Sequence, residues 1–267
     1  MGKLIKFFSR RRSWSLPYVL FLAVFVVAPL LLIMLYAFQG EDGGFTFANF
    51  DKFVHQREAI NTFIYSIGIA LITTLICIFL GYPAAYILSK MKASTARVVV
   101  MLFILPMWIN VLVRTLATVA LFDFLTLPLG EGALIFGMVY NFLPFMIYPI
   151  YNVLQKMDHS LIEAAEDLGA TPRQVFTKVI FPLSTPGIVS GVMMVFMPTI
   201  STFAIAELLT MNNIKLFGTT IQENINNGMW HYGAALSFIM LIMCCLRRRT
   251  LKLINVWFLS LPPSGAL

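Results

Sequence analysis

Residues 16–38 read LPYVLFLAVFVVAPLLLIMLYAF and follow a basic N-terminal segment that contains Arg10, Arg11 and Arg12. The run has no charged residue, and it is longer than the ~20 residues that cross a bilayer core as a helix. A secretory signal has an apolar region of only about 7 to 15 residues. We therefore interpret the run as an uncleaved transmembrane helix.

The rest of the chain has the same apolar character. Of its 267 residues 59% are hydrophobic and 12% are charged, whereas soluble domains are about half apolar and about one-quarter charged. The composition excludes a soluble or disordered chain and predicts an all-α polytopic membrane protein with about six transmembrane helices. The five further apolar segments lie at about 63–89, 98–121, 133–154, 184–207 and 230–246.

Basic residues alternate between the loops. Of the 19 lysines and arginines, 15 precede the first segment, separate the second from the third, or follow the fourth and the sixth. The positive-inside rule then places both termini in the cytoplasm of a bacterial cell, in its inner membrane. The net charge of +7 follows from this topology and predicts no nucleic-acid partner. The expected domains are a basic N-terminus over 1–15, a membrane domain over 16–246 and a cytoplasmic tail over 247–267.

A polar loop at about 158–182 separates the fourth and fifth apolar segments. Its core reads EAAEDLGATPRQVFTKVIFP. Asp158 or Ser160 can cap a first helix, and Gly169 can end it. Thr171, followed by a proline, can begin a second helix that leads into the fifth segment.

Small and charged residues are mixed in this 158–182 loop. Alanines beside a glycine let another surface approach closely, and Glu163 and Arg173 can hold it by charge-assisted hydrogen bonds. The loop is thus a candidate docking knob. The alternative is a solvated hairpin that only connects two helices.

The order Glu163, Ala164, Ala165 and then Gly169, followed by VIFP at 179–182, resembles the EAA loop of type I ABC-importer permeases. In that family the loop inserts into a cleft on the ATPase subunit. The resemblance implies that ATP and magnesium are bound by that partner and that this chain carries no cofactor. The residues that it assigns to coupling with the ATPase are Glu163, Ala164, Ala165, Asp167, Gly169 and Arg173.

Three further stretches narrow the resemblance, which covers roughly residues 15 to 240. They are PMWINVLVRT at 106–115, GMVYNFLPFMIYPIY at 137–151, and Trp230 with GAALS at 233–237. They resemble the spermidine/putrescine permeases, and the PotB type in particular. The resemblance implies polyamine import with a second, homologous permease subunit and an extracytoplasmic substrate-binding protein. The alternatives are an ABC permease for sulfate, iron or a sugar, and a secondary transporter.

Motifs of catalysis are absent from the sequence. No Gly-x-x-x-x-Gly-Lys-Ser/Thr loop occurs, so the chain is not expected to bind ATP by a P-loop. His55, His159 and His231 lie in loops or at a membrane edge, and no His-Glu-x-x-His pattern accompanies them. We expect a transport subunit with neither a catalytic nor a metal site.

Charged and aromatic residues inside the apolar segments are candidates for the substrate path. Arg114 lies within the third segment, where it either lines the gate or extends outward to pair with Asp123 or Glu207, the latter at the end of the fifth segment. Eight of the twelve acidic residues fall on the outer side, which favours a cationic substrate. Aromatic faces can hold an ammonium group, or they can be packing residues. The predicted path residues are Trp108, Asn110, Arg114, Asp123, Tyr140 and Glu207.

Overall fold

The computed structural model describes residues 16–40 and 43–243, and its regular structure is helical. The chain divides into two compact units: the first comprises the residues up to Arg57 together with Ile221–Met243, and the second comprises Glu58–Thr220. The predicted N-terminus over 1–15, the end of the sixth apolar segment and the tail over 247–267 lie outside the described residues.

The first unit contains the predicted first span. Its segments are α2 (Leu16–Leu22), η1 (Ala23–Val27) and α3 (Ala28–Ala37), which together form one apolar helix over Pro17–Ala37. In the most apolar part of this helix no residue is buried within the chain. A cluster of aromatic rings packs after this helix. The Phe38 ring centroid lies 5.0 Å from that of Phe50 in α4 (Ala48–His55) and 5.6 Å from that of Phe238 in the helix Trp230–Met243.

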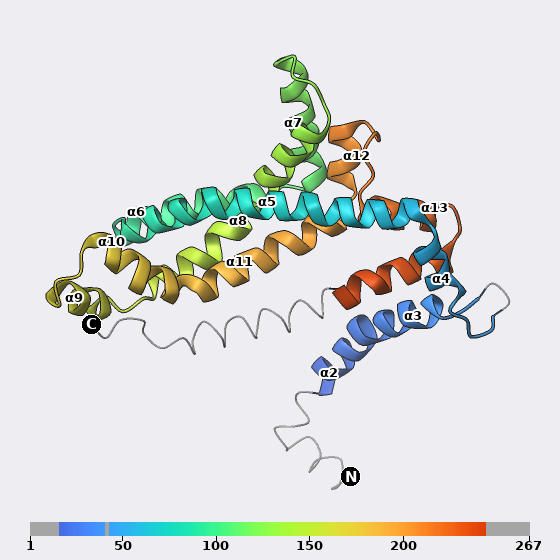
Figure 1. The fold of residues 1–267 in the computed structure, drawn as a ribbon, viewed down its shortest axis with the longest axis horizontal. Helices are drawn as coiled ribbons and strands as arrows, with labels where there is room; N and C mark the ends of the chain where they lie inside the picture. The colour runs from blue at the N-terminus through green and yellow to red at the C-terminus, as the bar shows by residue number, and fades with distance from the viewer. Residues whose placement is uncertain (1–15, 41–42, 244–267) are drawn as a thin grey trace, which may run out of the picture. The chain divides into compact units, whose positions relative to one another are not determined.

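Three long helices form the body of the second unit. They are α5 (Arg57–Lys90), α8 (Glu131–Gln155) and α11 (Phe181–Ser201), which lie side by side (Figure 1). Small residues permit the close approach, as is usual in membranes. A Cβ on Gly81 would lie 3.0 Å from Met146 Cγ, and one on Gly187 would lie 3.0 Å from Ile150 Cα. The α5 helix has 34 residues and so spans about 51 Å, more than a bilayer core.

The third predicted span is not one continuous helix. It consists of α6 (Ala93–Ile104), η2 (Leu105–Trp108) and α7 (Val111–Phe124), with a bend of 95° between its two parts. Pro106 has no N–H to continue the helical ladder, and Ile109 and Asn110 are extended, with ψ of 137° and 135°. The side chain of Asn110 then caps α7 by accepting a hydrogen bond from the Leu112 N–H at 2.8 Å.

The fifth predicted span begins as expected but ends earlier. Helix runs without a break over Pro172–Ser201, through α10 (Pro172–Val175), η3 (Phe176–Ile180) and α11, so the second helix of the 158–182 loop does lead into this span. Thr202 is extended, and a separate short helix α12 (Ala204–Thr210) follows, then α13 (Phe217–Asn226). Gly218 contacts the carbonyl oxygen of Ser201, an approach that no side chain would permit.

Four helices in the described part of the chain are long and apolar enough to cross a membrane, and the bent pair can supply a fifth span. They match the predicted first, second, fourth and fifth segments. They are Pro17–Ala37, Arg57–Lys90, Glu131–Gln155 and Pro172–Ser201. The helix Trp230–Met243 is shorter, and the predicted sixth span continues into residues that are not described.

Candidate functional site

The 158–182 loop begins with the helix α9 (Ser160–Asp167), whose N-cap residue His159 makes no side-chain cap bond. One residue earlier, the Asp158 carboxylate accepts a hydrogen bond from the Ser160 backbone N–H at 3.0 Å, so of the two predicted capping residues it is Asp158 that bonds to the first turn. This bond favours the ionised form and lowers the pKa of Asp158 below its usual value. The cap is therefore kept at neutral pH and is lost only as the pH falls through that lowered pKa.

Gly169 reverses the chain after α9. Its φ is +82°, a left-handed conformation that glycine adopts without steric cost. Its N–H donates to the Glu166 carbonyl at 2.8 Å, and the Ala170 N–H donates to the Ala165 carbonyl at 3.1 Å. The prediction that glycine ends the first helix is confirmed.

A capping box starts the second helix of the loop. The Thr171 hydroxyl accepts a hydrogen bond from the Gln174 N–H at 3.4 Å, while the Gln174 side chain accepts one from the Thr171 N–H at 2.8 Å. Pro172 occupies the first turn, where a missing N–H has no cost. The backbone groups at this turn are thus satisfied within four residues.

The loop presents most of its predicted coupling residues to the outside. Glu163, Ala164, Asp167, Gly169 and Arg173 are exposed. The side chain of Ala165 is different, because it is half-buried and packs against the hydrophobic core of the second unit. In Figure 1, α9 and α10 lie together at the end of this unit where α6 begins.

Leu168 was not among the predicted residues, although 89% of it is exposed at the tip of the loop. A single leucine between Asp167 and Gly169 offers an apolar surface that nothing in the described part of its own chain covers. The signal was present in the sequence as an apolar residue directly before the glycine of a helix end. A single exposed leucine is common on protein surfaces, so Leu168 gains meaning only together with the charged residues of the same loop.

The predicted path residues belong to η2, α7, α8 and α12 of the second unit and to the turn before α7. Helices α7, α8 and α12 pack against one another, and Figure 1 shows α7 and α12 projecting together from the long helices. Between them, these helices and the adjoining turns hold all six residues: Trp108, Asn110, Arg114, Asp123, Tyr140 and Glu207. Glu207 belongs to α12 and not to the end of the fifth span, which corrects the expectation from the sequence.

Arg114 does not extend outward to pair with an acid. It is 8% exposed, and its Nε and Nη1 atoms are buried without a hydrogen-bond partner. No ion pair within 4.0 Å joins it to Asp123 or Glu207, both of which the structure describes. In this conformation Arg114 therefore pairs with neither acid.

The other path residues differ in exposure. Trp108 is 88% exposed and Tyr140 is 43% exposed, so both present aromatic faces. Asp123 is exposed near the end of α7, and Glu207 is partly buried. Asn110 has the structural task of capping α7. The structure thus supplies two aromatic faces and two carboxylates on adjacent elements, which is suitable chemistry for a cationic solute.

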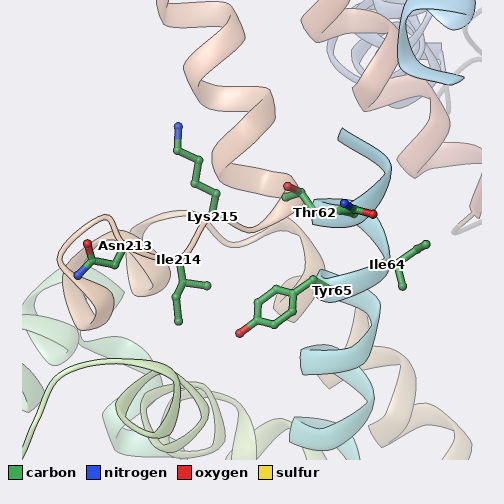
Figure 2. Close-up of a pocket in the computed structure, with 7 residues that line it drawn as sticks. Thr62, Ile64, Tyr65, Asn213, Ile214 and Lys215 are labelled. Carbon is green, nitrogen blue, oxygen red and sulfur yellow. The ribbon is translucent and has the colours of Figure 1, made fainter. Parts of the chain in front are cut away.

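A pocket of about 680 Å³ lies elsewhere in the second unit, between the start of α5 and the turn after α12 (Figure 2). Figure 2 shows Tyr65 and Ile214 facing its interior while the Lys215 side chain extends away. Its lining residues include a lysine and no carboxylate, so it does not suit a polycation. The sequence carried no pattern that would have indicated it. In the described residues, no group of three or more His, Cys, Asp or Glu could hold a metal ion.

Comparison with known proteins gives a consistent result. Residues 77–255 match the family model described as "binding-protein-dependent transport system inner membrane component". The spermidine/putrescine transport system permease protein PotB of Salmonella typhimurium is 33% identical, with 88% of this chain and 91% of that protein covered. PotB of Escherichia coli is 32% identical, with 88% and 95% covered, and the PotB homolog of Mycoplasma genitalium is 28% identical, with 82% of each covered.

Solved structures agree on the fold. A chain of a bacterial alginate ABC transporter, crystallised in complex with an alginate pentasaccharide-bound periplasmic protein, superposes with a TM-score of 0.71. The alignment covers 91% of this chain and 94% of that chain, and the two are 14% identical. At this identity the likeness shows a shared fold and not a shared substrate.

Proposed function

Since the chain belongs to the family of binding-protein-dependent transport system inner membrane components, we propose that it is the permease subunit of an ABC importer for spermidine and putrescine. The polyamine relatives, matched over 88% of the chain, carry the substrate assignment. The two aromatic faces and two carboxylates on η2, α7, α8 and α12 support it, because a polycation that leaves water needs such groups in place of its hydration.

The ATPase is a separate subunit in this proposal. The exposed 158–182 loop supports that division. Its second helix begins with a capping box, and its exposed side chains are free to contact another subunit. Leu168 supplies an apolar anchor, and Glu163 and Arg173 surround it with charge, as at a docking hot spot with a polar rim. A second, homologous permease subunit and an extracytoplasmic binding protein complete the importer.

Uptake by the complete importer tests the substrate. With ATP supplied, proteoliposomes that contain the complex should accumulate labelled spermidine, and putrescine should compete. Competition by sulfate, iron or a sugar instead would replace the polyamine assignment with one of those solutes. Uptake driven by an ion gradient without any ATPase subunit would establish a secondary transporter.

Glu207→Gln should weaken spermidine uptake without changing the amount of protein in the membrane, since it removes one carboxylate from α12. Glu58→Gln is a matched control, because Glu58 is an exposed carboxylate at the start of α5 and belongs to none of the helices that carry the predicted path residues. Equal uptake by both variants would remove Glu207 from the path.

Topology and hydrolysis have direct tests as well. We infer that both termini are cytoplasmic, so a reporter that is active only outside should work when fused at Gly44 and fail when fused after Arg249. The purified chain alone should hydrolyse no ATP. Hydrolysis should appear only when the ATPase subunit and the partner permease are added.

A further inference from the structure

Two adjoining pockets lie within the first unit, apart from the proposed path. One, of about 440 Å³, is mainly apolar and is lined by Leu32 and Ile33 of α3 and by Ala234 of the last described helix. The other, of about 410 Å³, is more polar and includes Lys52. Trp230 and His231 line both, so the two pockets share a wall.

The shared wall stands at a membrane boundary. Trp230 is the first residue of the helix Trp230–Met243, and Tyr36 is the next-to-last residue of α3. The His231 Nδ1 lies 3.3 Å from the Tyr36 carbonyl oxygen, and the two rings are 5.4 Å apart, which joins the ends of the two helices. Aromatic residues at helix ends are typical of the headgroup level of a bilayer.

The apolar pocket adjoins an exposed apolar helix surface. None of the most apolar window of Pro17–Ala37 is buried within the chain, and Leu32 is 53% exposed. A volume of 440 Å³ falls within the range of about 300–1,000 Å³ of ligand sites. An occupant of this pocket must therefore be apolar and reach it from the membrane.

The polar pocket carries a positive charge. The Lys52 ammonium lies 4.6 Å from the centroid of the Tyr232 ring, whose hydroxyl donates to Gln56 Oε1 at 2.9 Å. Among the described residues that line this pocket there is no carboxylate, and the neighbouring Asp51 pairs with His55 at 3.2 Å. An occupant that complements Lys52 is anionic.

We propose that the first unit binds one anionic phospholipid, with an acyl chain in the apolar pocket and the phosphate headgroup beside Lys52. An amphiphile is the one class of ligand that fits both pockets across the shared wall of Trp230 and His231. The site rests on the membrane placement of the proposed permease but not on its substrate. The packing of the first membrane helix, Pro17–Ala37, would then depend on the share of anionic lipid in the bilayer.

The test uses the complete importer in nanodiscs of phosphatidylcholine that contain a small share of phosphatidylglycerol with a photoreactive acyl chain. Crosslinks should map to α3 and to residues 230–237. Lys52→Gln should lower this labelling about fivefold by removing the charge, and Ala234→Trp should lower it by filling the apolar pocket. The matched controls are Arg57→Gln and Ala23→Trp, both at exposed positions that do not line either pocket.

Equal labelling in all four variants would overturn the site. So would unlabelled phosphatidylglycerol that lowers the labelling no more than the same amount of additional phosphatidylcholine, which lacks the net negative charge, or lipid crosslinks that map to the partner permease instead of these pockets. Spermidine uptake measured on the same samples separates the two proposals. If the unmodified importer is labelled by the lipid as expected but takes up no spermidine, the transport assignment is wrong and the lipid site stands.

Discussion

The 158–182 loop and the α7–α12 pair place their polar groups in opposite environments. In the loop, Gln174 and Thr171 satisfy each other's backbone at a surface, and the charged side chains are exposed. In the pair, Arg114 is buried, and two of its nitrogens have no partner. The hydroxyls of Thr115 and Thr118 bond back to their own helix and do not help it.

The difference shows two ways in which a transporter can use polar residues. A loop whose hydrogen bonds are all local keeps its shape while it is pushed, which suits the transmission of force. Arg114 is 8% exposed, and two of its three guanidinium nitrogens have no partner, which disfavours this arrangement and narrows its free-energy gap to others. We infer that the 158–182 loop moves as a rigid body and that the α7–α12 pair rearranges during transport.

The largest expected effect comes from removing the buried charge. Arg114→Met should raise the stability of the importer by roughly 1–4 kcal/mol, because a desolvated charge is replaced by an apolar chain of similar length. Uptake should fall if the charge serves the rearrangement. The measurement is the unfolding temperature in detergent together with spermidine uptake.

Arg114→Lys keeps the charge and is the control for that experiment. It should leave stability close to that of the original protein. A lower unfolding temperature in Arg114→Met would mean that the guanidinium has a partner, and the contrast between the two regions would disappear.

The next effect concerns the reversal at Gly169. Gly169→Val forces a β-branched residue into a left-handed backbone, which costs about 1–3 kcal/mol. The loop should lose its shape, and both ATPase co-purification and uptake should fall. Gly169→Asn is the matched variant, since asparagine tolerates this conformation.

Apart from its neighbours in the chain, no atom of the described residues lies within 4 Å of the position that a Cβ on Gly169 would occupy. A substitution there is therefore limited by the left-handed backbone conformation and not by a lack of space within the chain. If Gly169→Asn lowers ATPase co-purification and uptake as much as Gly169→Val, the cause is the added side-chain volume at the contact with the ATPase. Full association of the Val variant would show the loop to be a solvated hairpin.

A smaller effect is expected from Glu163→Ala. The side chain is exposed, so its removal leaves the fold unchanged but deletes one charge-assisted contact with the ATPase. Association should weaken by about tenfold, as measured by titration of the ATPase subunit onto the permease in nanodiscs. Glu58→Gln, at the other end of α5, should have no effect, and an equal loss in both variants would indicate a general effect of charge.

The smallest effect tests the cap alone. Thr171→Ala removes one half of the capping box and should cost about 1 kcal/mol, because one backbone N–H loses its acceptor. Hydrogen exchange at the Gln174 amide should accelerate, while exchange in α8 stays as it is. Faster exchange throughout α11 would show that the loop and the fifth span are one cooperative element.

Much of the 158–182 loop could be predicted because its structure depends on neighbours in the chain. The glycine, the threonine–proline start and the aspartate cap each act within four residues, and each lies where the sequence placed it. Leu168 was overlooked, although its pattern was visible. The orientation of Ala165 toward the core was not predictable, because it depends on how α9 rests on the second unit.

The bend at 105–110 has two markers in the sequence. They are Pro106 and the capping residue Asn110. The hydropathy of 98–121 is uniformly apolar, and it therefore does not reveal a bend that involves only a few residues. The separation of α12 from α11 had no such marker. Beyond it the chain returns to Ser201, because a Cβ on Gly218 would clash with the carbonyl oxygen of that residue, 17 positions earlier.

By itself, the sequence determined the membrane class, the first, second and fourth spans, the turns of the 158–182 loop and the family resemblance, because hydropathy and helix capping act over short distances along the chain. Only the tertiary structure decided how sharply the third span bends, that Glu207 lies on its own helix and that two nitrogens of the buried Arg114 have no partner. The physical reason is that desolvation and pairing depend on which helices pack together. That packing is a property of contacts between segments far apart in the chain.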